Sequence, residues 1–350
     1  MNKLSKTALA VLLAVIVIIA VVAGVYYFMF QQKKPEEITG KIDFYTSIPK
    51  PIAVELVEMF NKKYPNIKVN LIRQGTTKIL AKLYAEIEAD KIICDVIWVA
   101  DPSGIIDLKN KGLLMKYTPS VADKIPFRDP DGYWWAGRII IPVIAYNTEL
   151  VKTLPKRWTD LIDPNYRKNL PDPWKTGEGW CAIPNPLYSG SAVANVYALS
   201  KKYGWDFFKK LRANGVIVLK SNTVVLNNIV NKECPIGVTL DYMVRKAAGE
   251  GVSVKYLFPE EGIVIIPSPI AIMKDTPYPE AAKIFVEYML SEEVQKKLAE
   301  LGVIPGRSDI APPEGVPSLD KVPKLNIDWD ELARELETVR STFEEIMLKG

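Results

Sequence analysis

The chain has 350 residues, of which 45 are Lys or Arg and 41 are Asp or Glu, so its formal net charge is only +4. This balance predicts neither a basic surface for nucleic acid nor an acidic tail. The chain contains no His, which removes the commonest metal ligand and general base and argues against a hydrolase with the usual catalytic triad.

The first segment is an uncharged apolar stretch from Ala8 to Phe30, preceded by Lys3 and Lys6. At about 1.5 Å per residue it would extend roughly 35 Å as a helix, enough to cross the apolar core of a bilayer. We therefore expect residues 1–30 to be a membrane anchor or uncleaved signal, with the remainder outside the cytoplasm, and residues 31–40 to be a tether. A cleaved signal peptide is the alternative, but its apolar region is normally shorter.

About 310 residues follow the tether, a length typical of two domains. Ile42–Tyr45 alternate as a strand, and apolar residues then recur at helical spacing from Ile52 to Phe60. The same order repeats twice, with strand-like runs at 67–72 and 92–100 and a helical pattern after each. This alternation predicts right-handed crossovers and a mainly parallel, buried sheet.

The second half of the chain repeats the theme with different lengths. The stretches CAIPNP, IVLKSN, PIGVTLD and VSVKYLFP read as strands and alternate with amphipathic helices, which predicts a second α/β unit. A last helix carries apolar residues spaced by three and four from Trp329 to Ile346. We expect it to dock onto the body of the protein rather than to form a coiled coil.

The three cysteines, Cys94, Cys181 and Cys234, show no CxxC spacing, so no zinc or redox site is predicted. Cys94 lies in an apolar strand and is expected to be buried. Cys181 and Cys234 could pair in an exported domain. The sequence leaves this disulfide open, because it does not give the distance between the two residues.

Small hydroxyl residues recur where predicted strands end and helices begin. There, free backbone N–H groups and the positive ends of helix dipoles point into the crevice where parallel sheets bind ligands. Asp101 and Ser103 follow the third strand, where an ordinary helix cap is the alternative. With three other such loops they predict a cleft between two domains that holds an oxyanion. The other loops contribute Thr46 and Ser47, Thr76 and Thr77, and Ser189, Gly190 and Ser191.

A set of phrases, in order from residue 41 to about 310, carries a resemblance to a known family. They are FYTS, CDVIWVADPSGIIDLKNKGLLMKY, DPDGYWWAGRIIIPVIAYNTELV, WTDLIDPNY, ANGVIVLKSN, PIGVTLDY and AAKIFVEYMLSEEVQKKL. The chain resembles the extracellular solute-binding proteins of ABC importers, of the two-lobed type II periplasmic-binding-protein fold, and within them the ferric-iron and phosphonate branch. The resemblance implies two α/β lobes with mainly parallel sheets that close over a ligand by a hinge motion.

In that layout, residues 41–143 and 264–305 form the first lobe. Residues 144–263 and 306–350 form the second lobe, with the C-terminal helix docked on it. The chain is expected to cross between the lobes near residues 141–146 and to return near residues 264–269.

The resemblance also suggests ligand contacts. Iron-binding members of the branch use a His, an acidic residue and paired tyrosines, but this chain has no His and keeps only Tyr242 of the pair. Glu88 or Asp90 would mark the acidic position, so a ferric ion would be held by Tyr242 and Glu88 with an added anion or chelator. The hydroxyl-rich loops, with Arg138 as a bidentate partner, resemble the phosphonate-binding members more. A surface ion pair is the alternative role for Arg138.

The sequence therefore predicts an anchored, outward-facing monomer that captures a small solute and delivers it to an ABC permease in the membrane. The solute would be a phosphorylated or phosphonate-type anion or a ferric complex, and no cofactor, nucleic-acid partner or catalysis is expected. Two other classes stay open. One is a sensory ectodomain that reports occupancy to another chain. The other is an enzyme on the same fold, which would need a base and a nucleophile within reach of each other.

Overall fold

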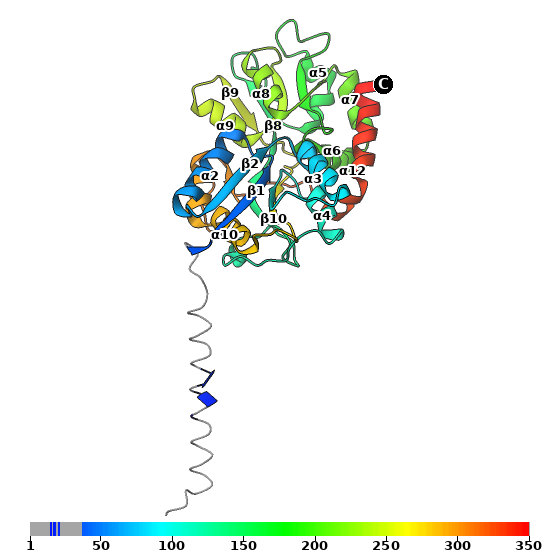
Figure 1. The fold of residues 1–350 in the computed structure, drawn as a ribbon. Helices are drawn as coiled ribbons and strands as arrows, with labels where there is room; N and C mark the ends of the chain where they lie inside the picture. The colour runs from blue at the N-terminus through cyan, green and yellow to red at the C-terminus, as the bar shows by residue number, and fades with distance from the viewer. Residues whose placement is uncertain (1–14, 16, 19, 22–36, 350) are drawn as a thin grey trace, which may run out of the picture.

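A computed structural model describes residues 37–349 and the isolated residues 15, 17, 18, 20 and 21. It contains two β-sheets, each covered by helices, which lie one above the other in Figure 1. The predicted anchor and tether, residues 1–40, lie almost wholly outside the described residues. Among the residues that are described, no helix is both long and apolar enough to span a membrane.

The first sheet has six strands in the order β11-β4-β10-β3-β1-β2. The strands are β1 (Gly40–Thr46), β2 (Ile67–Arg73), β3 (Val96–Trp98), β4 (Trp135–Ile140), β10 (Ile266–Ile272) and β11 (Ile304–Pro305). The accompanying helices are α2 (Lys50–Lys63), α3 (Thr76–Glu88), α4 (Ser103–Asn110), the short η2 (Ala122–Lys124), α10 (Pro279–Met289) and α11 (Glu292–Glu300).

The second sheet has five strands in the order β7-β6-β8-β5-β9. The strands are β5 (Pro142–Asn147), β6 (Cys181–Pro184), β7 (Ile217–Leu219), β8 (Ile236–Leu240) and β9 (Val254–Leu257). The accompanying helices are η3 (Trp158–Ile162), α5 (Pro164–Arg167), α6 (Gly190–Tyr203), α7 (Asp206–Ala213), α8 (Asn222–Val230) and α9 (Asp241–Gly249).

Both sheets are mixed, so the expectation of mainly parallel sheets was wrong. β1 pairs in parallel with β2 and β3, but β10 runs antiparallel to β3 and β4. In the second sheet β6 pairs in parallel with β7 and β8, but β5 runs antiparallel to β8 and β9. β5 and β10 are the strands with which the chain enters the opposite sheet. They arrive from the other sheet rather than through a helical crossover, and each therefore runs against its neighbours.

The helices pack on the sheets through the apolar faces that their spacing predicts. In α2 the buried residues include Ile52, Leu56 and Phe60. Phe60 lies edge-on to Phe285 of α10, with ring centres 4.9 Å apart, which fixes α2 and α10 on the same side of the first sheet. This packing orients the N-terminus of α2 toward the cleft described below.

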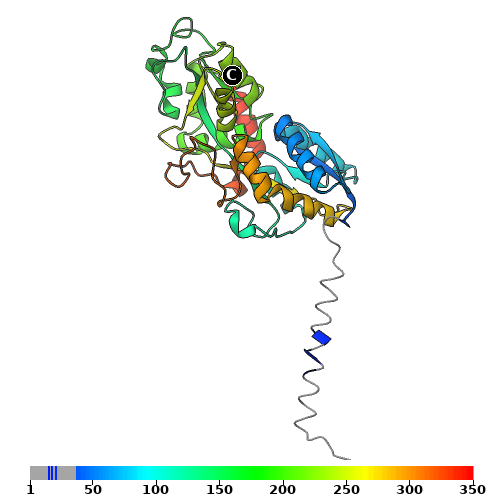
Figure 2. The ribbon, with the colours of Figure 1, turned by 90° about the vertical axis from the view of Figure 1, so that its left-hand side faces the viewer.

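The C-terminal helix contacts both halves of the molecule. It comprises α12 (Trp329–Glu344), continued by one π-helical turn, η4 (Glu345–Lys349). The sequence led us to assign it to the second lobe, but it packs against α4 beside the first sheet as well as against α6 beside the second. It occupies the side of the molecule away from α10 and α11, behind which it lies in Figure 2.

All three cysteines fall within the described residues, and all three are buried free thiols. The pairing that the sequence left open between Cys181 and Cys234 is thus not formed in this structure. Burial raises the pKa of the Cys234 thiol to about 12, so this side chain behaves as a neutral core residue at physiological pH.

Candidate functional site

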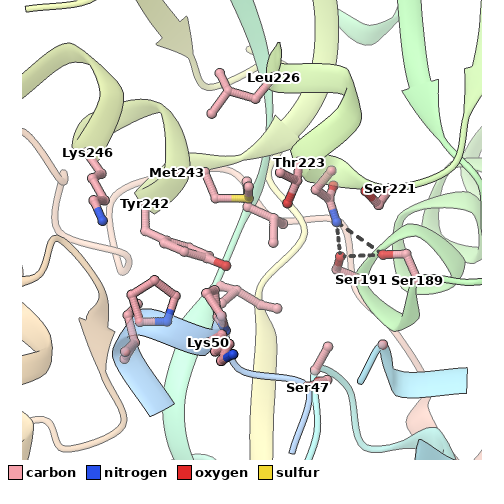
Figure 3. Close-up of a pocket in the computed structure, with 18 of the residues that line it drawn as sticks. Ser47, Lys50, Ser189, Ser191, Ser221, Thr223, Leu226, Tyr242, Met243 and Lys246 are labelled. Carbon is pink, nitrogen blue, oxygen red and sulfur yellow. Dashed lines mark hydrogen bonds between the residues drawn. The ribbon is translucent and has the colours of Figure 1, made fainter. Parts of the chain in front are cut away.

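A cleft of about 580 Å³ lies between the two halves and is lined by residues from both. The first half contributes the loop after β1, the start of α3 and β4. The second half contributes the starts of α6, α8 and α9. Figure 3 shows their side chains pointing into this space. A volume of this size suits a small organic ligand.

The cleft owes its polarity to helix starts that follow strand ends. Ser189 caps α6 by accepting a hydrogen bond from the backbone N–H of Ala192, and Ser221 caps α8 in the same way through Val224. Free backbone N–H groups and the positive ends of these helix dipoles therefore face the cleft. Such an arrangement stabilises a bound anion.

A cluster of hydroxyl and amide groups lines one end of the cleft. Asn222 Nδ2 donates hydrogen bonds to Ser189 Oγ at 3.1 Å and to Ser191 Oγ at 2.9 Å, as Figure 3 shows. Across the cleft, Thr76 Oγ1 donates to Ser47 Oγ at 3.0 Å. Ser47, Ser189 and Asn222 remain partly accessible, so both walls present groups that can bond an oxyanion.

Arg138 is the buried charge of the cleft. It lies on β4, is 2% exposed, and its Nε donates to Ser268 Oγ at 3.3 Å. Its guanidinium lies 5.6 Å from the ring centre of Tyr242. Its Nη1 has no hydrogen-bond partner among the described residues. Burial lowers the pKa of Arg138, but a guanidinium stays protonated in proteins, so the cleft holds a buried cation with an unused donor.

The cleft is positively charged overall. Its lining residues include four cationic side chains, Lys50, Arg73, Arg138 and Lys246, and one carboxylate, Glu250. Within the described part of the chain, Arg73 donates hydrogen bonds to two backbone carbonyls, those of Ile48 and Ser47. This excess of positive charge favours entry and binding of anions.

The structure brings seven of the predicted contact residues together at the cleft. They are Ser47, Thr76, Arg138, Ser189, Gly190, Ser191 and Tyr242. Thr46, Thr77, Asp101 and Ser103 were also predicted, and none of these four lines it. Thr46 is fully buried and uses its hydroxyl to donate to the backbone carbonyl of Trp98 at 2.7 Å, which holds β1 to β3.

Asp101 and Ser103 bond each other instead of a ligand. Asp101 Oδ1 accepts hydrogen bonds from both the backbone N–H and the hydroxyl of Ser103. The other carboxylate oxygen, Oδ2, faces the start of α6, where a Cβ added at Gly190 would lie only 1.9 Å from it. Asp101 is therefore a contact between the two halves, and the absence of a side chain at Gly190 makes room for it.

Thr77 points away from the cleft toward the C-terminal helix. Its Oγ1 accepts a hydrogen bond from Arg340 Nη2 of α12 at 3.3 Å. Thr76 and Thr77 are adjacent on α3 and so point about 100° apart around the helix axis. Only Thr76 can face the ligand, and Thr77 instead secures α12.

The resemblance suggested Glu88 or Asp90 as the acidic partner of Tyr242 for a ferric ion. Glu88 is the last residue of α3 and Asp90 lies two residues beyond it, whereas Thr76 at the N-terminal end of α3 lines the cleft. At about 1.5 Å per residue these ends are roughly 18 Å apart, so Glu88 and Tyr242 are not brought together. The described residues contain no group of three or more His, Cys, Asp or Glu side chains arranged to hold a metal ion.

Sequence reasoning missed part of the cleft. Lys50, Arg73, Ser221, Asn222 and Lys246 all line it. Ser221 and Asn222 follow β7 and open α8, the same strand-to-helix pattern that identified Ser189. The pattern was therefore present in the sequence and could have identified these two residues, whereas nothing local distinguishes the two lysines from surface lysines.

Several known proteins are similar to this chain. The "Putative 2-aminoethylphosphonate-binding periplasmic protein" of Salmonella typhimurium is 28% identical over 205 residues, which is 55% of this chain and 58% of that protein. Two solved structures share the fold. AfuA from Actinobacillus pleuropneumoniae, with exogenous fructose-6-phosphate bound, has a TM-score of 0.78 at 22% identity. Iron-bound HitA from Pseudomonas aeruginosa has a TM-score of 0.75 at 21% identity.

The two structural likenesses extend over nearly the whole folded part. The AfuA comparison covers 89% of this chain and 99% of that one, and the HitA comparison covers 88% and 99%. The sequence profile of bacterial extracellular solute-binding proteins matches residues 41–296. This match spans most of the chain, which therefore belongs to the bacterial extracellular solute-binding protein family.

Proposed function

We propose that this chain is the substrate-binding component of an ABC importer and that its solute is a small anion carrying a phosphate or phosphonate group. The family membership supports solute capture rather than catalysis. A relative named for 2-aminoethylphosphonate and a structural neighbour with fructose-6-phosphate support the choice of anion. The chemistry of the cleft supports an anionic solute more directly than these likenesses do.

The observation that carries the proposal is the buried guanidinium of Arg138. A cation that is 2% exposed and has an unpaired Nη1 is costly to bury unless something bonds it. A tetrahedral oxyanion would supply the missing acceptor and balance the charge. Its remaining oxygens would meet the hydroxyls of Ser47, Thr76 and Ser191, which line the same cleft.

A ferric ion bound directly by protein side chains fits this cleft less well. Fe(III) prefers several anionic oxygen ligands, but the cleft offers one carboxylate, Glu250, and two phenols, Tyr188 and Tyr242, and of these Glu250 and Tyr188 are exposed. Burial raises the pKa of Tyr242, which opposes formation of a phenolate. We therefore favour the phosphate or phosphonate anion over the ferric complex.

The proposal includes the placement of the protein. Each sheet with its helices would act as one lobe, corresponding to residues 41–143 with 264–305 and residues 144–263 with 306–350. The apolar stretch from Ala8 to Phe30 would anchor the chain with its folded part outside the cytoplasm. Capture at the membrane surface would place the loaded protein, as a monomer, next to an ABC permease.

Isothermal titration of the full chain in detergent tests the anion. Inorganic phosphate, methylphosphonate, 2-aminoethylphosphonate and fructose 6-phosphate are the probes, with ferric citrate as the competing class. We expect at least one phosphorus oxyanion to bind and to raise the melting temperature, because a ligand that binds only the folded state stabilises it. Binding of ferric citrate without any response to the phosphorus compounds would reject the proposal.

Replacing the buried cation gives the second test. We expect Arg138→Gln to weaken binding of the responding phosphorus compound by about 10- to 100-fold, the range for loss of a charge-assisted hydrogen bond. Arg334→Gln is the matched control, because Arg334 is exposed on α12 and does not line the cleft. Equal affinities of the two variants would show that Arg138 does not hold the anion.

A further inference from the structure

The cleft has a second, apolar end that the anion site does not use. Five aliphatic side chains line it: Leu226, Val230, Met243, Ala247 and Val252. Leu226 and Val230 stand four residues apart on α8, and Met243 and Ala247 stand four apart on α9, so each pair shares one helical face. In Figure 3, Leu226 and Met243 lie on the side of the pocket away from Ser47.

This apolar end is open to the cleft rather than closed by packing. Val230, Met243, Ala247 and Val252 are only partly buried. Pro49, Pro51 and Ile52 at the start of α2 line the cleft from the other half of the molecule. A ligand held between these walls would cover apolar surface on both sides, which favours an apolar group at this position.

The volume also exceeds what an anionic group alone would fill. About 580 Å³ corresponds to roughly twenty water molecules at about 30 Å³ each. A phosphate or phosphonate group would occupy only the polar end beside Arg138. The cleft therefore has room for a body that extends along α8 and α9.

The side chains at this end decide the chemistry of that body. A sugar body would bring hydroxyl groups that need partners, and the five aliphatic side chains offer no donor or acceptor. The polar side chains on the same faces of α8 and α9, Thr223, Asn227, Lys246 and Glu250, are all exposed, whereas the aliphatic ones are wholly or partly buried. Hydroxyls seated against the aliphatic side chains would therefore replace few of their bonds to water. An aryl or alkyl body loses nothing in this way and gains the apolar contact.

We infer, on the basis of the proposed anion site, that the solute is a phosphate or phosphonate with an aryl or branched-alkyl substituent seated between α8 and α9. Lys50 and Lys246 flank this end from opposite halves. Lys246 Nζ lies 3.9 Å from Glu250 Oε1, and Lys50 is exposed at the start of α2. These charges sit at the rim and leave the floor of the subsite aliphatic.

The test compares phosphorus oxyanions with different bodies, two phosphonates and one phosphate monoester. Titration of the full chain in detergent with phenylphosphonate, methylphosphonate and glucose 6-phosphate separates the two ends of the cleft. We expect phenylphosphonate to bind at least tenfold more tightly than both other probes. If methylphosphonate binds and phenylphosphonate is no tighter, or glucose 6-phosphate is the tightest, the apolar subsite is rejected while the anion site stands. If none of the three binds while another phosphorus oxyanion of the first panel does, the apolar subsite is rejected and the anion site stands; if no phosphorus oxyanion binds at all, the proposed function itself fails.

A variant pair tests which residues make the subsite. We expect Met243→Ser to reduce the phenylphosphonate-to-methylphosphonate affinity ratio from at least tenfold to below threefold. Met59→Ser on α2 is the matched control, because Met59 is also partly buried but lies outside the cleft. An unchanged ratio in Met243→Ser would overturn the assignment. Val252→Thr, which keeps the side-chain shape, provides the same readout if Met243→Ser does not fold.

Discussion

Two buried charges at the boundary between the halves serve different purposes. Arg138 faces the cleft with an unused donor, whereas Asp101 is enclosed by protein on every side. Asp101 accepts two hydrogen bonds from Ser103, lies against Gly190, and has Arg340 as the nearby cation. Burial is the largest influence and raises the pKa of Asp101. The folded state therefore favours the protonated form of this carboxyl.

This shift predicts a pH-dependent effect of Asp101→Asn. Protonation of Asp101 stabilises the fold fully below the unfolded pKa of about 3.9, and this contribution is lost as the pH rises through the raised folded pKa. Asparagine is neutral throughout and still accepts a bond from Ser103. We expect the free energy of unfolding of the variant to exceed that of wild type by about 1 kcal/mol at pH 8. This difference should disappear toward pH 4.

Urea denaturation of both proteins at several pH values measures this difference. Asp275→Asn is the control, because Asp275 is exposed. A variant that is less stable than wild type at pH 8 would show that attraction between Asp101 and Arg340 outweighs the cost of burial.

At the scale of elements, α12 ties the halves together. Glu331 accepts a hydrogen bond from Tyr197 and lies 2.9 Å from Lys201, both on α6. Farther along, Arg340 donates to Thr77 on α3, and Phe343 packs on Phe208 of α7 with ring centres 5.7 Å apart. Helical periodicity predicted that one face would dock, and Leu332, Val339 and Phe343 are the buried residues. It could not predict that this face meets both halves.

Removing an apolar contact of this helix should cost stability. Leu332 is 0% exposed, so we expect Leu332→Ala to lower the free energy of unfolding by about 2–4 kcal/mol through lost burial and a residual cavity. Leu348→Ala is the matched control, because Leu348 in η4 is 43% exposed and should cost about 0.5 kcal/mol or less. Equal losses in urea denaturation would mean that α12 is not packed as described.

At the scale of the whole molecule, three covalent or packed links join the two sheets. Ile141 alone separates β4 from β5, residues 258–265 lead from β9 back to β10, and α12 packs on both sides. Close contacts between Asp101 and Gly190, and between Gly75 and the carbonyl of Tyr188, bring the halves together at one end of the cleft. Short connections of this kind permit a hinge motion only where the packed contacts can separate.

A ligand held between the two halves should draw them together and so change the shape of the protein. We expect saturating methylphosphonate to reduce the radius of gyration of the full chain in contrast-matched detergent, measured by small-angle neutron scattering. The Arg138→Gln variant should show no change at the same concentration. An unchanged radius in wild type, with binding verified by titration, would mean that α12 holds the halves in one fixed arrangement.

The sequence by itself determined the parts that local spacing controls. The apolar face of α2, the strand-to-helix loops carrying Ser47, Thr76 and Ser189, and the solute-binding family were all predictable, and the family match confirms the last. These features depend on periodicity over one element or on motifs in order along the chain.

Only the tertiary structure decided which of these residues face the same space. Adjacent Thr76 and Thr77 point to the cleft and to α12, Asp101 meets Gly190 from the other half, and Glu88 lies at the far end of α3. The antiparallel placement of β5 and β10 likewise follows from the route of the chain between the sheets. Each outcome depends on contacts between residues far apart in sequence, and the pattern within a single element does not encode such contacts.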